Sequence, residues 1–371
     1  MLNITKACST ETQVYAPETL PSELAPAQSS LCQQNLMACV LLYNHCDNCY
    51  SEVANNGTIC PMNDTYDDEL HRSCLSQLTD LTIREVLINF KLRQTGLFAQ
   101  LFRLAVHLPA REFAKLVYRI DQDAGLFGLH GAALNALHHF VTRLEIRGWP
   151  TPAEGPLLVA ANHPGGTDPF VITAAIDRRD LYILSQEHII FKALPNISKY
   201  IICTAEDRSD GHLALRKTIN LLKDQKSVLL YPGGELELDP ALFPGSGILL
   251  RDWSRSIALI LSRIPEALVQ PAILRGTISL QAWKSWLTGF GKSVTTKLQI
   301  AMITQIAVQQ LKPDAYPVQT TLILGQPMRA SELDGKLDPD SIHHAMMSVV
   351  DQILRNDPLQ YPLLQEINPR V

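Results

Sequence analysis

The chain has 371 residues, of which 46% are hydrophobic and 19% are charged, so it can build one large domain with additions or two smaller domains. This composition excludes a fibrous or wholly disordered protein. The formal net charge is −5, but residues 1–80 carry −8, from ten carboxylates against Lys6 and Arg72, and the remaining chain is therefore near +3.

The first 78 residues differ in composition from the rest. They are rich in Ser, Thr, Asn, Gln and Pro without helical or strand periodicity, which predicts a flexible polar leader. They also hold seven of the eight cysteines, with Cys46 and Cys49 in a Cys-x-x-Cys. Three residues further along could complete a zinc site: Cys60, His71 and Cys74. The spacing fits no zinc motif and no secretion signal supports a disulfide framework, so we expect incidental thiols and no metal.

Amphipathic helices are predicted between residues 79 and 144. Thr82 to Glu85 is a capping-box pattern that opens the first helix, and a leucine stripe ends at Pro109. The stripe consists of Leu97, Leu101, Leu104 and Leu108. A second stripe consists of Phe113, Leu116, Val117 and Ile120. A last helix carries Ala133, Leu137, Phe140, Val141 and Leu144, and leads into a short strand at 144–147.

This helical segment is also basic, with seven basic residues and only two acids from Arg84 to Arg119. Three of the basic residues, Arg111, Lys115 and Arg119, are spaced four apart on one face. One interpretation is a set of helices that pack on the domain with solvated basic side chains. The other is a surface that lies on anionic lipid. No apolar run reaches the length of a membrane span, and the N-terminus lacks the basic flank and apolar stretch of a signal peptide, so we expect neither.

From residue 145 to 371 the sequence alternates between strand and helix patterns. Strands are predicted at 157–161, 181–184, 200–203, 227–231, 268–274 and 320–324, and helices at 169–176, 212–223, 253–264, 296–310 and 341–354. Strands separated by helical crossovers indicate an α/β fold with a largely parallel, mixed sheet flanked by helices. We therefore divide the chain into a leader, 1–78, an amphipathic helical segment, 79–144, and an α/β domain, 145–371.

The turn after the strand at 157–161 is the strongest candidate site. His163 follows the strand at its carboxyl end, where open α/β sheets bind ligands, and Asp168 precedes Pro169 at a helix start. The five-residue spacing allows the carboxylate to reach the imidazole and fix its tautomer. No Gly-x-Ser-x-Gly elbow supplies a protein nucleophile, so the pair would activate a substrate hydroxyl. The alternative is a helix-capping Asp168 and a histidine bonded to backbone.

Two further strand-end loops are polar. Arg208 lies in Glu206-Asp207-Arg208 before a helix, and could grip a phosphate or pair locally with an acid. Gly233 and Gly234 follow the strand at 227–231 and precede Glu235 and Glu237. These glycines could let backbone amides approach a ligand or could form an ordinary turn.

In order and spacing, these residues resemble four motifs of the glycerolipid acyltransferase superfamily, over roughly residues 145–330. Asn162-His163 with Asp168 is similar to the NHxxxxD motif, in which His is the general base and Asp orients it. Arg208 resembles the arginine implicated in binding the acceptor's phosphate. Tyr231-Pro232-Gly233-Gly234 stands where FPEGTRS is expected, and Pro271 lies in a segment similar to the fourth motif, near the acyl site. The resemblance implies substrate-binding roles for Asn162, Arg208, Gly233, Gly234, Glu235, Glu237 and Pro271.

The third motif departs from the phosphate-acceptor pattern. It has two glycines where Glu-Gly is frequent, and it resembles the PGGxxE version of members that esterify neutral alcohols, with Glu237 as its glutamate. Arg208 still favours an anionic acceptor. Acylation of a lysophospholipid and acylation of a neutral alcohol therefore both remain open.

The resemblance implies direct transfer of a fatty acyl group from acyl-CoA or acyl carrier protein, as co-substrate, to an acceptor hydroxyl. We expect no metal and no cofactor. The expected partners are a lipid acceptor and a membrane surface, with no nucleic acid, and the expected location is cytoplasmic and peripheral to the membrane. An ester hydrolase and a non-catalytic lipid or acyl-carrier binding protein are the competing functions.

Overall fold

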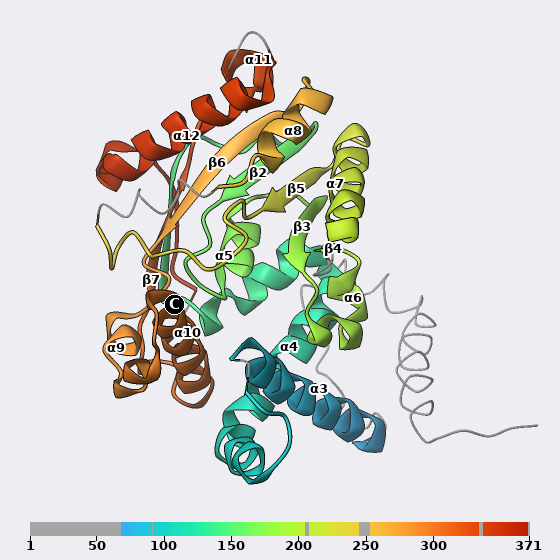
Figure 1. The fold of residues 1–371 in the computed structure, drawn as a ribbon, viewed down its shortest axis with the longest axis vertical. Coiled ribbons are helices and arrows are strands. Elements are labelled where there is room, and N and C mark those ends of the chain that lie inside the picture. The colour runs from blue at the N-terminus through green and yellow to red at the C-terminus, as the bar shows by residue number, and fades with distance from the viewer. Residues whose placement is uncertain (1–67, 91, 205–207, 245–252, 334–336, 370–371) are drawn as a thin grey trace, which may run out of the picture. The chain divides into compact units, whose positions relative to one another are not determined.

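The computed structural model describes residues 68–90, 92–204, 208–244, 253–333 and 337–369 (Figure 1). Contacts divide the chain into Met1–Asp64 and Thr65–Val371, and all the described residues belong to the second unit. Most of the predicted leader, with Cys46 and Cys49, lies outside the described residues. The predictions about zinc and disulfides in the leader concern this part of the chain. Cys74, by contrast, is buried in a helix.

Two helices, α3 (Asp68–Asn89) and α4 (Leu97–Ala136), precede the sheet. Helix α3 begins before the leader was expected to end, and Thr82 lies inside it, where its hydroxyl donates to the carbonyl of Leu78 at 2.8 Å. The predicted helix start at Thr82 is therefore wrong, because a Ser/Thr-x-x-Glu pattern also occurs within helices. No helix in the described part of the chain is long and apolar enough to span a bilayer.

Helix α4 continues through Pro109, where the leucine stripe was expected to end. Apolar packing on both sides of the proline outweighs the loss of one helical hydrogen bond, since Ala99, Ala110 and Ala114 are all buried. Helix α4 is interrupted at Gly128, whose φ of 75° is non-helical. The helix predicted around residues 133–144 is in fact the end of α4 followed by the short η1 (Leu137–His139).

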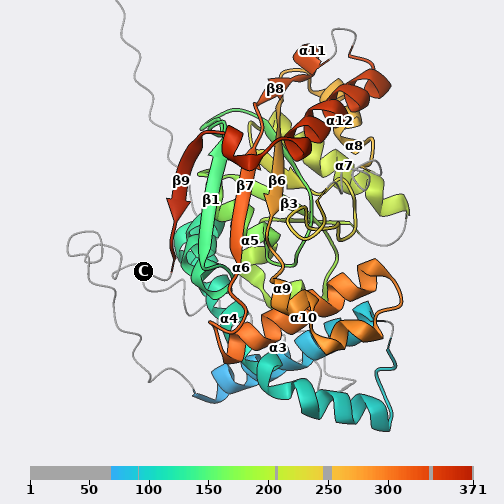
Figure 2. The same cartoon turned by 90° about the vertical axis from the view of Figure 1, so that its left-hand side faces the viewer.

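A single mixed sheet follows, with nine strands among the described residues in the order β4-β3-β5-β2-β6-β7-β1-β9, and with β8 paired to β6 (Figures 1 and 2). The bounds are β1 (Arg143–Gly148), β2 (Leu157–Ala161), β3 (Leu181–Gln186), β4 (Ile201–Thr204), β5 (Ser227–Leu230), β6 (Leu268–Arg275), β7 (Gln319–Leu324), β8 (Met328–Arg329) and β9 (Leu363–Ile367). The five strands from β4 to β6 are mutually parallel, whereas β7 pairs antiparallel with β6 and parallel with β1. The α/β fold with a largely parallel, mixed sheet is confirmed.

Helices cover both faces of the sheet. Their bounds are α5 (Asp168–Ala175), α6 (Pro195–Ser198), α7 (Arg208–Lys223), α8 (Ser256–Arg263), α9 (Leu280–Trp283), α10 (Val294–Leu311), α11 (Ala330–Leu333) and α12 (Pro339–Arg355), with short turns η2 (Ile189–Ala193), η4 (Trp286–Phe290) and η5 (Pro358–Gln360). The strands β8 and β9 and the short helices were not predicted, because they are brief or, for β9, exposed on most positions.

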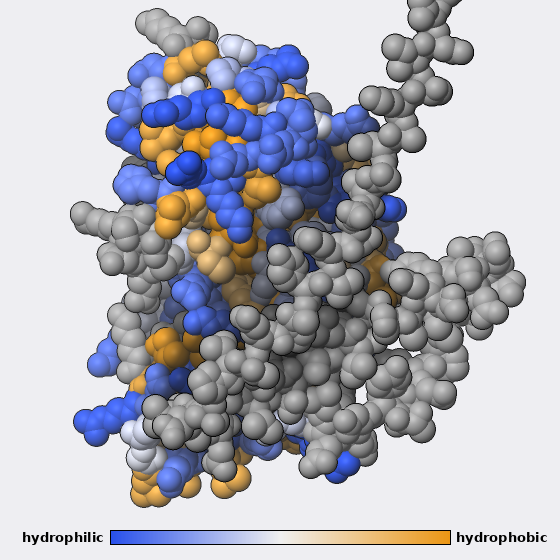
Figure 3. All heavy atoms as spheres, turned by 90° about the vertical axis from the view of Figure 1, so that its right-hand side faces the viewer, coloured by the Kyte–Doolittle hydropathy of each residue, from blue (hydrophilic) through white to orange (hydrophobic). Residues whose placement is uncertain are grey.

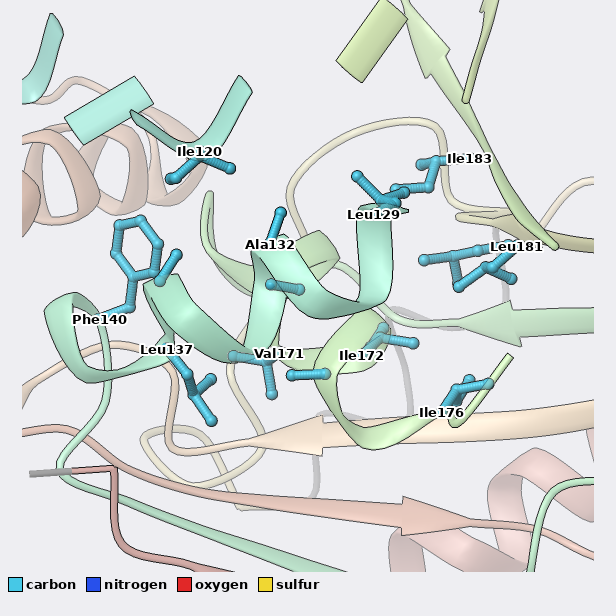
Figure 4. Close-up of a cluster of buried hydrophobic side chains, with 14 of the residues drawn as sticks. Ile120, Leu129, Ala132, Leu137, Phe140, Val171, Ile172, Ile176, Leu181 and Ile183 are labelled. Carbon is cyan, nitrogen blue, oxygen red and sulfur yellow. The ribbon is translucent and has the colours of Figure 1, made fainter. Parts of the chain in front are cut away.

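Strand β2 lies at the centre of this arrangement and is buried throughout. Leu157, Val159 and Ala161 pack with α4 and α5 on one face, while Leu158 and Ala160 pack with α8 and α12 on the other. Figure 4 shows part of the first of these clusters and labels Ile120, Leu129, Ala132, Leu137, Phe140, Val171, Ile172, Ile176, Leu181 and Ile183. Burial on both faces explains the continuous apolar run in the sequence and fixes where the next residues emerge.

Candidate active site

His163 and Asp168 meet at the carboxyl end of β2. His163 Nδ1 lies 3.0 Å from Asp168 Oδ2, and the Gly165 amide donates to the same oxygen at 2.7 Å. Asp168 is completely buried at the start of α5, whereas the His163 side chain is 25% exposed. The carboxylate therefore holds one ring nitrogen against the buried start of α5, while part of the His163 side chain stays exposed.

The surroundings of Asp168 are apolar and also negative. Burial raises the pKa of Asp168, the bond with His163 and the Gly165 amide lower it in part, and the charge of Asp239 raises it further. Oδ1 has no hydrogen-bond partner among the described residues. The carboxylate thus depends chiefly on His163 for a positive partner.

Tyr231 forms one wall of the site. Its ring stacks on the imidazole of His163, with centroids 4.4 Å apart and 26° between the planes. Burial, with a contribution from the charge of Asp168, raises the pKa of Tyr231 well above its usual value, so the hydroxyl stays neutral. The sequence placed Tyr231 at the end of a predicted strand and in the third motif, without a role of its own. Its role follows from the pairing of β5 with β2, which brings the two strand ends together.

Glu237 holds the backbone at His163. Its Oε2 accepts from the His163 amide at 3.1 Å, its own amide donates to the His163 carbonyl at 2.9 Å, and Oε1 accepts from Trp253 Nε1 at 2.7 Å. Burial is the largest cause that raises the pKa of Glu237 to about 7, and the charge of Asp168 adds to it, against the opposing effects of Trp253 and His163. These contacts make Glu237 a residue that positions the backbone of His163. The substrate contact that the resemblance implied for Glu237 stays a prediction.

Asn162 also has a structural contact. Its amide donates to the carbonyl of Leu274 at 3.0 Å and accepts from the amide of the same residue at 2.7 Å. The side chain therefore ties the end of β2 to β6, and the substrate contact that the resemblance implied for it stays a prediction. Pro271 is buried within β6, beside Ala160 of β2, and its carbonyl accepts from Gly325 at 2.8 Å.

The two glycines and Glu235 lie in the turn after β5. Gly234 has a φ of +71°, and Glu235 is exposed. A Cβ at Gly233 would contact the Glu237 carboxylate, so the small residue is needed for that carboxylate to reach His163. Arg208 is the first residue of α7 and its side chain lies outside what the structure describes, but its backbone follows β4 at the same sheet edge.

Asp239 is a further site residue that the sequence did not single out. It is fully buried, and its oxygens accept from the amides of Gly276, Thr277 and Ile278 at 2.7–3.1 Å. This carboxylate shapes the loop after β6, whose Thr277 lies against Gly165 in the His163 turn. No cluster of metal-ligating side chains occurs in the described ranges.

Residues 143–250 match the model of the Acyltransferase family. This segment is therefore similar to acyltransferase domains. The matched segment contains the His163–Asp168 pair, Arg208 and Glu237, and it ends before Pro271, so three of the four motifs lie within it. The match confirms the resemblance at the level of the family.

The chain is also similar to a solved structure, the 1-acyl-sn-glycerophosphate (LPA) acyltransferase PlsC from Thermotoga maritima. The identity is 14% and the TM-score is 0.36, over 76% of this chain and 93% of that one. No curated protein matches the chain.

Proposed function

We propose that the protein is an O-acyltransferase that moves a fatty acyl group from acyl-CoA or acyl carrier protein to a hydroxyl of a lysophospholipid or related glycerolipid. The observation that carries this proposal is the dyad itself. A buried carboxylate holds Nδ1 of a partly exposed histidine at 3.0 Å at the end of a parallel strand. The family match supports acyl transfer as the reaction.

In the proposed mechanism, the Nδ1–H of His163 donates a hydrogen bond to the carboxylate of Asp168, and the Nε2 lone pair is left free for the acceptor. Nε2 removes the hydroxyl proton as the oxygen attacks the thioester carbonyl. When the tetrahedral intermediate collapses, the C–S bond breaks, the imidazolium returns its proton to the thiolate, and the ester leaves. Asp168 stabilises the imidazolium during both steps.

Two features of the sequence support different acceptors. Arg208, at the start of α7, supports an anionic acceptor because an arginine binds phosphate through two parallel hydrogen bonds. The Gly233 turn and Glu237 support a neutral alcohol through their likeness to the PGGxxE pattern. We favour a lysophospholipid as the acceptor, because Arg208 would then bind its charged headgroup.

The acceptor would come from a bilayer to which the protein binds peripherally on its cytoplasmic side. Support comes from the first half of α4, where the leucine stripe faces solvent, with Leu97 73% and Leu104 77% exposed. Arg93 and Arg111 are exposed beside it. Figure 3 shows apolar side chains at the lower margin of the molecule, the end at which Figure 1 places this half of α4. An apolar stripe flanked by basic residues is typical of helices that lie on anionic lipid.

The test is acyl transfer by the purified full chain, with labelled acyl-CoA or acyl carrier protein and a panel of lysophospholipids and neutral alcohols. We expect an acceptor-dependent ester product, and we expect His163→Ala to abolish it. His344→Ala, which removes an exposed histidine of α12, is the matched control. Acylation that survives in His163→Ala would refute the mechanism. Acyl release that does not depend on an acceptor would identify a hydrolase, and binding without any product would identify a non-catalytic protein.

A further inference from the structure

A second apolar element lies outside the helical segment that the sequence associated with membranes. It runs from Leu280 to Val294, through α9 and η4. Ala282 is buried and Trp283 packs partly buried in the cluster formed with Leu298 and Ala301, so one side of the element is anchored. The other side is open, with Trp286 76% and Phe290 71% exposed.

The charge of this element points to its partner. Lys284 and Lys292 are exposed on either side of the aromatic pair, and residues 280–297 contain no Asp or Glu. The rings of Trp286 and Phe290 contact each other edge to face, with centroids 5.7 Å apart. Indole rings prefer the boundary between hydrocarbon and water, and lysines there attract anionic headgroups.

We infer that Leu280–Val294, here called the aromatic element, is a second lipid-binding element that inserts Trp286 and Phe290 into the interface of an anionic bilayer. A second copy of the chain fits less well, because a two-fold contact through this patch would bring Lys284 and Lys292 close to their counterparts. The inference rests on the proposed function in one respect, namely that the acceptor lipid comes from the bilayer.

The aromatic element is well placed to bring the dyad to the bilayer. It packs on α10, and Met302 of α10 lies so close to Gly166 that a Cβ there would contact its sulfur. One helix thus separates the aromatic element from the turn that carries His163. Figures 1 and 2 both place α9 and α10 at the same lower end as α3 and the first half of α4. Two apolar elements at one end would hold the turn that carries His163 close to the membrane.

The test measures flotation of the full chain with vesicles of equimolar phosphatidylcholine and phosphatidylglycerol. We expect Trp286→Ser/Phe290→Ser to lower the partition coefficient at least tenfold. The matched control is Leu359→Ser, which changes a residue of similar exposure, 72%, in η5. Lys284→Gln/Lys292→Gln should lower binding about 25-fold at low salt, from roughly fivefold per lysine, and should not alter binding to pure phosphatidylcholine.

A second measurement does not depend on a disruptive variant. Lipids brominated in their acyl chains should quench the tryptophan fluorescence of the bound parent, and Trp286→Phe should remove that quenching while it retains vesicle binding. Thermal unfolding midpoints check that every variant folds. His163→Ala should bind vesicles as the parent does, so a failure of catalysis is distinguishable from a failure of docking.

Three results would overturn the inference. One is binding by Trp286→Ser/Phe290→Ser equal to that of Leu359→Ser. Another is no quenching of Trp286 in the bound parent. The third is a dimer, detected by light scattering, that the double variant abolishes with no change in vesicle binding, since that would assign the patch to a second copy of the chain.

Discussion

Replacing Asp168 by Asn should remove the negative charge of the dyad while it preserves the geometry of the dyad. Oδ2 of Asp168 accepts from both the Gly165 amide and His163, whereas Oδ1 has no hydrogen-bond partner among the described residues. An amide nitrogen at the Oδ2 position would face the N–H of Gly165, so the Asn oxygen should take that position. His163 then keeps its orientation and tautomer and loses only the adjacent negative charge.

The size of the effect follows from the charge that forms on His163 during the reaction. Two unit charges about 4 Å apart interact by about 4 kcal/mol at an effective dielectric constant of about 20. The interaction exists only when the ring is protonated, so the loss falls on the transition state. We therefore expect kcat to fall about a thousandfold and KM to stay near the parental value.

The assay is the initial rate of ester formation over a range of acceptor concentrations. Asp177→Asn is the matched control, because Asp177 lies just after the same helix with its side chain 93% exposed. Asp168→Ala should be at least as slow and also less stable, since it leaves the Gly165 amide without its acceptor. A kcat for Asp168→Asn within tenfold of the parental value, or a loss confined to KM, would refute the reasoning.

Two further predictions concern Glu237. Because its pKa in the folded chain is about 7, against an ordinary value of 4.5, the folded chain holds this proton more tightly than the unfolded chain. The contribution of Glu237 to the free energy of unfolding should therefore be largest below pH 4.5 and fall by about 3 kcal/mol as the pH rises to 7. Urea unfolding should show a smaller fall in the free energy of unfolding between these pH values for Glu237→Gln than for the parent. The same pH dependence in the variant and the parent would contradict this prediction. Gly233→Ala should cost about 1–3 kcal/mol of stability and reduce activity by displacing Glu237, whereas Gly289→Ala, with open space at its Cβ, should stay within about 0.5 kcal/mol; equal costs would contradict the assignment.

The sequence was sufficient to predict the dyad because its determinants are local. The apolar run at 157–161 reads as a buried strand, Asp168-Pro169 reads as a helix start, and the intervening loop is too short to carry Asp168 far from His163. The parallel order of the strands then places the loops after β2, β4 and β5 at one edge. These inferences need only periodicity and the chemistry of turns.

The supporting residues could not be predicted because their contacts are distant in the sequence. Glu237 reaches the backbone of His163, and Asp239 reaches Thr277, across segments whose relative positions depend on strand order. Sequence reasoning treats an isolated Asp or Glu in a loop as solvated, and that is its commonest fate. The wrong prediction at Pro109 has the same origin. Helix α4 continues there because the flanking alanines are buried, and local helix propensity gives no information on burial.

Three buried carboxylates, Asp168, Glu237 and Asp239, each fix a loop of the site by accepting backbone amides. Asp239 raises the pKa of Asp168, and Asp168 raises that of Glu237, so their charges act on one another. In the proposed mechanism, these buried groups lie around the turn that carries His163 and form an environment that is set by folding and needs no rearrangement during the reaction. Such an environment would stabilise the imidazolium that forms in the transition state. The groups that hold the backbone in place would therefore also promote the proposed proton transfer.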